Sequence, residues 1–232
     1  MNLCVIPARG GSKRIPRKNI KKFNDKPIIA YSIEAALLSK CFDQVIVSTD
    51  DQEVANIAVK YGANVPFLRP AELSDDYSGT IPVVQHAINW MEGNNKIQNV
   101  CCLYATAPFV RPEILSDAYQ KMLDSNTDFC FSVTSYAFPI QRALKIKNQV
   151  GLQMFYPENF DIRSQDLEEA YHDAGQFYWG KVESFKRNLP LFSNASYPYL
   201  LPRYLVQDID TMEDWIRAEA MFKVLKSIKQ IK

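Results

Sequence analysis

The sequence predicts an α/β protein in which helices flank a mostly parallel β-sheet. Short apolar runs, typical of buried strands, recur along the chain. Amphipathic helical patterns separate most of these runs. Strand and helix patterns that alternate at short spacing are the signature of parallel strands joined by crossover helices.

The first half of the chain follows this alternation closely. Pro27 suits a first helical turn, and Asp50 or Asp51 can cap a helix that ends near Gly62. Two further helices are predicted over residues 80–91 and 111–124. The predicted strands of this half are residues 3–7, 44–49, 64–68 and 100–104.

The second half is less regular. Residues 128–135 continue the pattern of buried strands, and residues 175–180 predict a short aromatic strand. Between them, residues 139–158 alternate loosely between apolar and polar, with Gly151 at a turn, which indicates a β-hairpin that leaves the main sheet. Residues 211–226 predict a closing amphipathic helix.

Length and composition bound the class of protein. Hydrophobic residues make up 47% and charged residues 23% of the 232 residues, and the formal net charge is +1. That balance argues against a general nucleic-acid or membrane-surface binder, whose basic excess is usually larger. We expect one domain over residues 1–232, with an inserted arm at about residues 136–170.

The five cysteines include no C-x-x-C pair, and four of them lie in apolar, strand-like runs. They are expected to be small buried hydrophobes rather than disulfide partners. No charged N-terminal segment precedes a long apolar stretch, and no window approaches the length of a membrane span. We therefore expect a cytoplasmic protein without a signal peptide or a membrane contact.

A basic loop directly follows the first predicted strand. Residues 6–19 read IPARGGSKRIPRKN, and seven basic residues lie from Arg9 to Lys22 with no acidic residue among them. Gly10 and Gly11 permit backbone geometries closed to other residues, so successive N–H groups could bind an anion. Open α/β sheets bind ligands at the carboxyl ends of their strands, so this loop is expected to hold a triphosphate or pyrophosphate. A solvated basic loop is the alternative, and neither a Walker A nor a G-x-G-x-x-G spacing is present.

This loop, together with residues 68–73 (LRPAEL) and 207–211 (QDIDT), resembles the CMP-sialic acid synthetase (acylneuraminate cytidylyltransferase) family. The resemblance extends from Leu3 to about Leu225. It implies a Rossmann-like fold of the nucleotide-diphospho-sugar transferase type and a homodimer joined by the protruding β-arm. It also implies a Mg²⁺ cofactor and the transfer of CMP from CTP to a nine-carbon sugar acid.

The resemblance implies roles for single residues in the nucleotide site. Arg9, Ser12 and Lys13 match family residues that touch the phosphates, and Arg69 matches one near the cytosine. A structural arginine at Arg69 and an ordinary helix start at Thr80 stay open as alternatives. The expected nucleotide-binding residues are Ala8, Arg9, Gly10, Gly11, Ser12, Lys13, Asn19, Arg69 and Thr80.

Asp208 and Asp210 match the paired aspartates of the family. Alternate residues on an extended segment point the same way, and two such carboxylates repel unless a cation lies between them. Mg²⁺ prefers one or two carboxylates with phosphate oxygens and waters, so the pair is expected to hold the metal. The alternative is that Asp210 only caps the following helix. Lys13, Arg9 and Asp208 are expected to carry catalysis, with Asp208 or a metal-bound water as the base.

Two segments that border the sugar site in the family depart from the sialic acid pattern. Residues 104–108 read YATAP, and residues 172–175 read HDAG. With residues 101–105 and 163–175, they are most similar to the branch of the family that acts on pseudaminic acid. The expected sugar-binding residues are Tyr104, Arg163, Gln165, His172 and Asp173. A salt bridge within the arm is the alternative for Arg163, and a core histidine is the alternative for His172.

The expected reaction is in-line displacement at the α-phosphorus of CTP by the anomeric hydroxyl of the sugar acid. Enzymes for N-acetylneuraminic, legionaminic or 3-deoxy-octulosonic acid are the nearest alternatives. A non-catalytic nucleotide-binding module and a nucleic-acid-binding protein are more distant ones. The paired aspartates argue against the module, and the balanced charge argues against nucleic acid.

Overall fold

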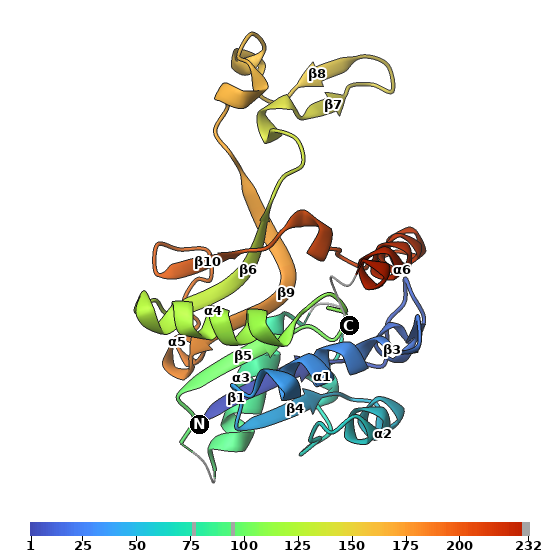
Figure 1. Cartoon of the computed structure of the whole chain (residues 1–232), viewed down its shortest axis with the longest axis vertical. Coiled ribbons are helices and arrows are strands. Elements are labelled where there is room, and N and C mark those ends of the chain that lie inside the picture. The colour runs from blue at the N-terminus through green and yellow to red at the C-terminus, as the bar shows by residue number, and fades with distance from the viewer. Residues whose placement is uncertain (76–77, 94–95, 229–232) are drawn as a thin grey trace.

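The computed structural model describes residues 1–75, 78–93 and 96–228 of the chain. Within that part, six strands form a central sheet in the order β10-β6-β9-β5-β1-β4. Helices cover both faces of this sheet, and an arm projects from one end of it (Figure 1). The predicted α/β fold class is confirmed.

Two groups of parallel strands build the sheet. β4 and β5 pair in parallel with β1, and β10 pairs in parallel with β6. β9 lies antiparallel between β5 and β6 and joins the two groups, so the sheet is mostly parallel, as predicted. The strands are β1 (Asn2–Pro7), β4 (Gln44–Ser48), β5 (Asn99–Leu103), β6 (Phe129–Ser135), β9 (Tyr171–Lys181) and β10 (Ser196–Leu200).

The helices fall into two layers that match the alternation of side chains along the strands. In β1, Cys4 and Ile6 face one core with α1, α4 and α6, whereas Leu3 and Val5 face a second core with α3 and α5. No helix of the described residues is long and apolar enough to cross a membrane. The helices are α1 (Ile28–Ser39), α2 (Gln52–Lys60), α3 (Thr80–Glu92), α4 (Pro112–Asp124), α5 (Val182–Lys186) and α6 (Met212–Ser227).

One predicted strand is wrong. Residues 64–68 form two isolated bridges, from Asn64 to Ile46 and from Leu68 to Thr49, rather than a strand. Pro66 stands between them and has no backbone N–H to donate to a ladder. The edge strand β10 and a small hairpin of β2 (Lys22–Phe23) and β3 (Lys26–Pro27) were not predicted from the sequence.

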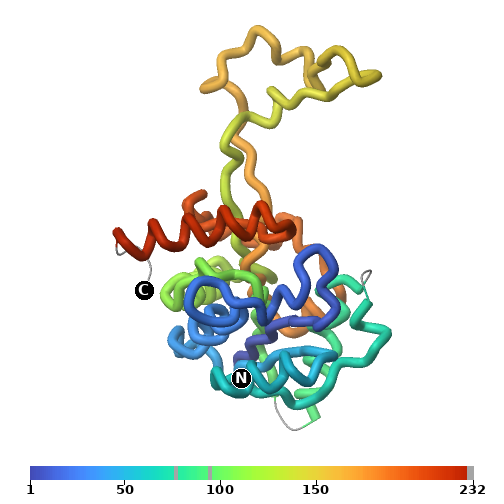
Figure 2. The backbone as a smooth tube through the Cα atoms, turned by 90° about the vertical axis from the view of Figure 1, so that its right-hand side faces the viewer, coloured from blue at the N-terminus to red at the C-terminus, as the bar shows by residue number. Residues whose placement is uncertain are grey.

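The arm begins after β6 and returns to the sheet as β9 (Figures 1 and 2). Its far part holds an antiparallel hairpin of β7 (Leu144–Ile146) and β8 (Leu152–Met154). The hairpin expected within residues 139–158 is therefore present, and it lies away from the main sheet as predicted. At the base of the arm, the register between β6 and β9 shifts between Phe131 and Val133.

All five cysteines are free, and Cys4, Cys101, Cys102 and Cys130 are buried. Burial raises the pKa of the Cys4 and Cys101 thiols well above the usual range. These thiols stay protonated and pack as small apolar groups, as the sequence predicted.

Candidate active site

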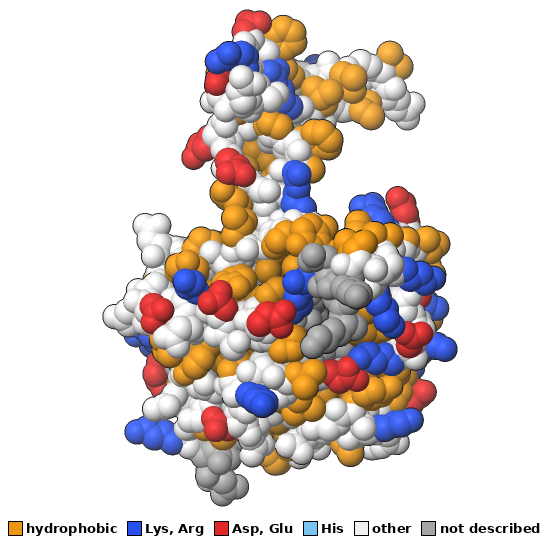
Figure 3. All heavy atoms as spheres, viewed as in Figure 1, with side chains coloured by type: hydrophobic (Ala, Val, Ile, Leu, Met, Phe, Trp, Pro, Cys, Tyr) orange, Lys and Arg blue, Asp and Glu red, His pale blue; other side chains and the backbone are white. Residues whose placement is uncertain are grey.

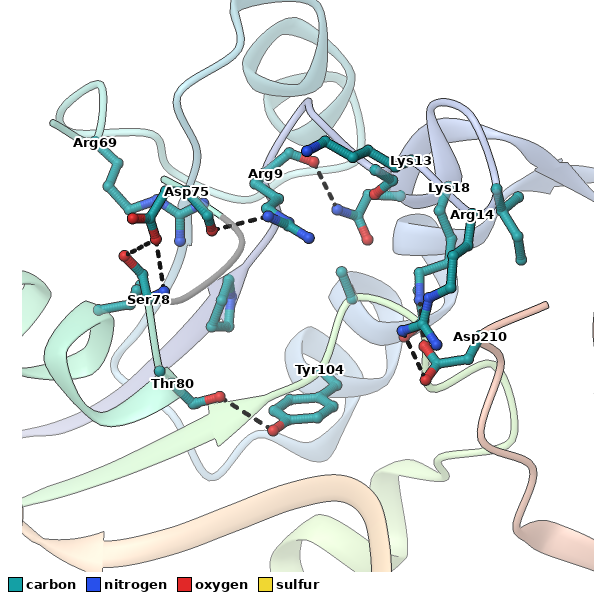
Figure 4. A pocket seen from close by; sticks show the side chains of 18 of the residues that line it. Arg9, Lys13, Arg14, Lys18, Arg69, Asp75, Ser78, Thr80, Tyr104 and Asp210 are labelled. Atoms are coloured by element: carbon teal, nitrogen blue, oxygen red, sulfur yellow. Dashed lines mark hydrogen bonds and ion pairs between the residues drawn. The ribbon is translucent and has the colours of Figure 1, made fainter. Parts of the chain in front are cut away.

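A pocket of about 430 Å³ lies where β1 and β5 end (Figure 4). Its walls come from the loop after β1, the start of α3, the residues after β5 and the segment before α6. Parallel strands of an α/β sheet place such crevices at their carboxyl ends. The residues predicted for the site that line it are Arg9, Ser12, Lys13, Asn19, Arg69, Thr80, Tyr104 and Asp210.

Hydrogen bonds within the loop after β1 and to neighbouring residues hold this loop in place. The Gly10 N–H donates to Oδ1 of Asp50 at 2.9 Å, and the Ser12 N–H donates to the Gly10 carbonyl oxygen at 3.1 Å. Nδ2 of the buried Asn19 donates to the Arg9 carbonyl oxygen at 2.9 Å. Asn19 thus fixes the backbone of the loop from inside, in addition to lining the pocket.

The backbone at the two glycines of the loop does not have the conformation that was expected for binding an anion. Neither Gly10 nor Gly11 has a positive φ, and the Gly10 N–H already has an internal acceptor. The expected anion nest is therefore not formed there. Gly10 is needed for another reason: a Cβ atom would lie 2.6 Å from Oδ2 of Asp51. Neither glycine lines the pocket, and Ala8 is buried in the core.

The basic run divides into two groups with different partners. Arg9, Lys13, Arg14 and Lys18 line the pocket. Arg17 points instead to α2, where its guanidinium donates to both oxygens of Asp51 at 2.6 and 2.9 Å. A solvated loop does not account for four basic side chains on one pocket.

Arg9 and Arg69 connect the loop to the segment before α3. Nη1 of Arg9 donates to the carbonyl oxygen of Asp75 at 2.8 Å. The Arg69 side chain is buried, and its Nε donates to Oγ of Ser74 at 3.2 Å. Burial lowers the pKa of Arg69, and nearby Asp50 partly offsets that effect. Arg69 therefore both lines the pocket and holds the neighbouring loop, so a structural role for this residue is compatible with a role in binding the nucleotide.

Thr80 and Tyr104 form an uncharged polar part of the wall (Figure 4). Oγ1 of Thr80 lies 3.1 Å from the Tyr104 hydroxyl. Thr80 is the first residue of α3, and Gly79 before it is the N-cap, so Thr80 is not the capping residue of this helix. Burial raises the pKa of Tyr104, so its phenol stays protonated.

The aspartate pair lies beside the basic loop. Ile209 is buried between the two more exposed aspartates, which agrees with an alternating, extended segment. Asp210 lines the pocket and pairs with Nη2 of Arg14 at 2.8 Å and Nζ of Lys18 at 3.2 Å. Partial burial and the neighbouring carboxylate of Asp210 raise the pKa of Asp208. The two carboxylates are therefore close enough to repel each other.

The structure tests the two alternatives for this pair. The capping alternative is wrong, because Thr211 and Asp214 form a capping box at the start of α6. Among the described residues, no group of three or more histidine, cysteine, aspartate or glutamate side chains could hold a metal. Of the two predicted metal ligands, Asp210 lines the pocket and Asp208 does not. Mg²⁺ needs only one or two carboxylates when phosphates and waters complete its shell, so the chemistry of this pair is compatible with the metal.

Four residues predicted to bind the sugar lie outside the pocket of their own chain. Arg163 is on the arm, where its Nε donates to Oδ2 of Asp166 at 2.7 Å, and Gln165 lines a separate cavity of about 290 Å³. His172 and Asp173 lie in β9 at the base of the arm. The salt-bridge alternative for Arg163 is present in the structure, whereas Tyr104 is the sugar-site residue that does line the pocket.

Several pocket residues were missing from the expected site. Arg14 and Lys18 belong to the basic run, so their charge and position were a usable signal. Asp75 and Ser78 carry no such signal, because only the fold brings the Asp75 carbonyl to Arg9 and Ser78 into the wall.

Fold and pocket together define a class of protein. Cationic side chains and the Asp210 carboxylate on a pocket where parallel strands end suit the phosphates of a nucleotide, which is the arrangement of a nucleotidyltransferase. A model of the cytidylyltransferase family matches residues 3–229. The chain belongs to this family, which confirms the class of enzyme predicted from the sequence.

Individual relatives refine this placement. The pseudaminic acid cytidylyltransferase of Campylobacter jejuni subsp. jejuni serotype O:2 is 49% identical, over 96% of this chain and 97% of the relative. The CMP-N,N'-diacetyllegionaminic acid synthase of Legionella pneumophila is 34% identical, over 96% of each protein. A solved CMP:2-keto-3-deoxy-manno-octonic acid synthetase complexed with CTP has a TM-score of 0.70 at 16% identity, covering 96% of this chain and 98% of that one. This last likeness shows the fold alone.

Proposed function

We propose that this cytidylyltransferase transfers CMP from CTP to the anomeric hydroxyl of pseudaminic acid and releases pyrophosphate. The observation that carries the choice of sugar is the 49% identity with the Campylobacter jejuni pseudaminic acid enzyme, against 34% with the legionaminic acid enzyme. Tyr104 supports this choice, because it lines the pocket and belongs to residues 104–108, a segment that departs from the sialic acid pattern. The free cysteines support a reducing, cytoplasmic setting for the reaction.

The basic residues of the pocket account for the phosphate chemistry. Transfer at phosphorus depends mainly on positioning and on stabilising the charge of the phosphoryl oxygens. Arg9 and Lys13 would receive the departing pyrophosphate, while Arg14 and Lys18 lie beside Asp210 on the same pocket. The hydroxyls of Thr80 and Tyr104 leave an uncharged region of the pocket for neutral polar groups of the substrates.

We include Mg²⁺ in this proposal, held by Asp208 and Asp210. When bound, the metal would neutralise charge on the α-phosphate. The raised pKa of Asp208 supports the placement, because two neighbouring carboxylates favour a cation between them. Arg14 and Lys18 orient Asp210 from the loop side and so keep its carboxylate on the pocket.

We further propose a two-fold homodimer that forms through the arm. Exposed apolar side chains gather on the arm (Figure 3). They include Phe138, Leu144, Ile146, Val150, Leu152, Phe155 and Phe160. Contiguous apolar patches of this kind mark interfaces, and two-fold dimers are the commonest symmetric assembly. In such a dimer, Arg163 and Gln165 act on a sugar site only if the arm reaches the pocket of the second copy.

Pyrophosphate release tests the proposed reaction directly. CTP is offered with pseudaminic, N-acetylneuraminic, legionaminic and 3-deoxy-octulosonic acid in turn, and UTP replaces CTP as the nucleotide control. We expect clear turnover with CTP and pseudaminic acid, and little with N-acetylneuraminic acid at equal concentration. Missing hydrogen-bond partners would leave polar groups of the wrong sugar unpaired, which is costly. Equal specificity constants for the two sugars would contradict the assignment of the sugar.

A further inference from the structure

Four side chains form a polar row that leads from β9 to the pocket wall. The hydroxyl of Tyr178 donates to Oδ2 of Asp173 at 2.6 Å. The Tyr178 and Tyr104 rings lie 5.4 Å apart between centroids with an interplanar angle of 49°, so the two phenols are neighbours. Tyr104 in turn contacts Thr80 at 3.1 Å. Of these four, Thr80 and Tyr104 line the pocket.

The sheet explains why these side chains meet. Cys102 of β5 lies opposite Tyr178 of β9, so Tyr104 is the diagonal neighbour of Tyr178 on the same face. Aromatic side chains reach each other at such diagonal positions. The row therefore begins with ordinary cross-strand packing.

A bulge in β9 completes the row. Opposite the register shift of β6, Gly175 adopts a φ of 61°, and its N–H donates to Oδ1 of Asp173 at 2.8 Å. The bulge brings the Asp173 carboxylate back towards Tyr178. Each carboxylate oxygen then has a donor within its own strand, so Asp173 is committed to this row.

The carboxylate sets the direction of the hydrogen bonds. An ionised carboxylate can only accept, so Tyr178 must donate to it. The oxygen of Tyr178 can then accept the proton of the Tyr104 hydroxyl. Once Tyr104 donates inward, its contact with Thr80 requires Thr80 to be the donor. The lone pairs of Thr80 and Tyr104, rather than their protons, are left for the pocket.

We propose that Asp173 and Tyr178 are positioning residues that turn the Thr80 and Tyr104 hydroxyls into acceptors for O–H and N–H groups of the sugar acid. This inference rests on the proposed function, because it takes the sugar acid as the ligand of that wall. The basic loop supplies cations for the phosphates of CTP. The sugar acid instead carries hydroxyl and amide N–H groups, which need hydrogen-bond acceptors. Burial raises the pKa of Tyr178 and of Tyr104, so both phenols keep the protons that the row requires.

Two variants interrupt the row at different points. Tyr178→Phe removes the middle hydroxyl and keeps the ring. Asp173→Asn keeps the shape, but its NH₂ then faces either the Gly175 N–H, which is a donor, or the Tyr178 hydroxyl, which must then accept instead of donate and so reverses the row. Because a hydrogen bond between such groups contributes modestly, we expect the KM for the sugar acid to rise about three- to tenfold in each variant. The KM for CTP should stay within about twofold.

The chain offers a matched control. The hydroxyl of Tyr199, on the edge strand β10, donates to Oδ2 of Asp117 in α4 at 2.8 Å. Tyr199→Phe and Asp117→Asn remove the same kind of hydrogen bond without touching the pocket. They should leave both KM values unchanged. Melting temperatures of all four variants report any general loss of stability, which lowers the active fraction but not the affinity for one substrate.

A double-mutant cycle completes the test. Thr80→Val should raise the KM for the sugar acid, and combining it with Tyr178→Phe should raise the KM by less than the product of the two single effects, because both changes act on the Thr80 acceptor. Unchanged KM values in Tyr178→Phe and Asp173→Asn, equal effects in the Tyr199 and Asp117 variants, or a rise for CTP alone would each overturn the inference. Wild-type protein that turns over none of the sugar acids would instead refute the proposed function, and the two failures are thereby distinguished.

Discussion

The sheet body and the arm place their apolar side chains in opposite ways. In the body, Leu3, Val5 and Ile6 of β1 are fully buried between the sheet and its helices. On the arm, Phe138 is 82% exposed and Ile146 is 72% exposed. The body can therefore gain its hydrophobic stabilisation within one chain, whereas the apolar residues of the arm gain little until another surface covers them.

The ion pairs of the body and of the arm also differ. Around the loop after β1, charged side chains reach across the fold, as Arg17 does to Asp51 and Lys18 does to Asp210. On the arm, Arg163 pairs with Asp166 only three residues away. Long-range pairs fix the geometry of a site, while a local pair fixes only its own turn. The ordered polar geometry therefore lies in the body, which holds the pocket, whereas the arm presents exposed apolar surface.

The strongest test of the body is Lys13→Ala. Lys13 lines the pocket where we propose that the phosphates bind, and losing one preorganised charge contact of this kind costs about 10²–10³ in rate. Lys22→Ala is the matched control, because Lys22 belongs to the same basic run but does not line the pocket. Steady-state turnover with CTP and the sugar acid is the measurement. Near-normal turnover of well-folded Lys13→Ala protein would remove the phosphate role from the loop.

The aspartate pair should give the next largest effect. Asp208→Asn and Asp210→Asn should each weaken the Mg²⁺ dependence of turnover and lower the rate on the order of 10²-fold, because a metal stabilises the transition state by several kcal/mol. EDTA should abolish the activity of the parent protein. Asp161→Asn, an exposed position on the arm, is the control. Activity that survives thorough chelation would falsify the metal role.

The proposed role of the arm in dimerisation is tested by the molecular mass of the protein in solution rather than by a reaction rate. Ile146 and Leu152 are paired in the hairpin, and both are exposed in the single chain. Replacing both with glutamate should weaken the dimer about tenfold to hundredfold, because the charges would have to be desolvated in the interface. Leu38→Glu, at an exposed apolar position on the body, should leave the dimer intact. Light scattering at micromolar concentration is decisive, and a monomeric wild type would end the proposal.

Two adjacent glycines provide a finer test of the loop. A Cβ at Gly10 would meet Asp51 at 2.6 Å, whereas a Cβ at Gly11 would meet nothing within 4 Å. Gly10→Ala should therefore displace Asp51, disturb its pair with Arg17 and cost about 1–3 kcal/mol in the free energy of unfolding. Gly11→Ala should change that free energy by about 0.5 kcal/mol or less. Urea unfolding compares the two, and equal losses would show that Asp51 does not restrict position 10.

The sequence predicted the elements that are buried on both faces, because their apolar runs are continuous. It failed at the edges of the sheet. Residues 64–68 looked like a strand but contain a proline, and β10 (SYPYL) was missed because proline and polar residues break its pattern. Whether an edge segment pairs as a strand depends on its neighbours in the fold, and the local sequence pattern does not contain that information.

The residues of the candidate site also fall into those that the sequence predicted and those that it did not. The basic loop was predictable because its charge and its position after a strand follow from the sequence itself, whereas Asp210 was predicted from the resemblance to the family. The commitment of Asp173 to Gly175 and Tyr178 was not, since it depends on a bulge in β9. The arm residues Arg163 and Gln165 were expected at the sugar, but the distance between arm and pocket is a property of the fold.

The smallest expected effect compares an ion pair of the body with one of the arm. The guanidinium of Arg17 lowers the pKa of Asp51 to about 2. A carboxyl whose folded pKa is depressed stabilises the protein above its unfolded value near 3.8, and this contribution is lost as the pH falls towards 2. Asp51→Asn keeps an N-cap for α2 but removes the charge, so it should cost on the order of 1–2 kcal/mol at pH 7, after solvent screening.

That difference between wild type and Asp51→Asn should shrink between about pH 4 and pH 2, because the wild-type carboxyl becomes protonated over this range. Asp166→Asn is the matched variant on the arm. Its partner Arg163 is 72% exposed at the side chain, and exposed pairs contribute little to stability, so its effect should be near zero at every pH. Urea unfolding from pH 7 down to about pH 2 measures both. Equal pH dependence in the two variants would mean that the loop pair is no better ordered than the arm pair, and the contrast between the two regions would not extend to their ion pairs.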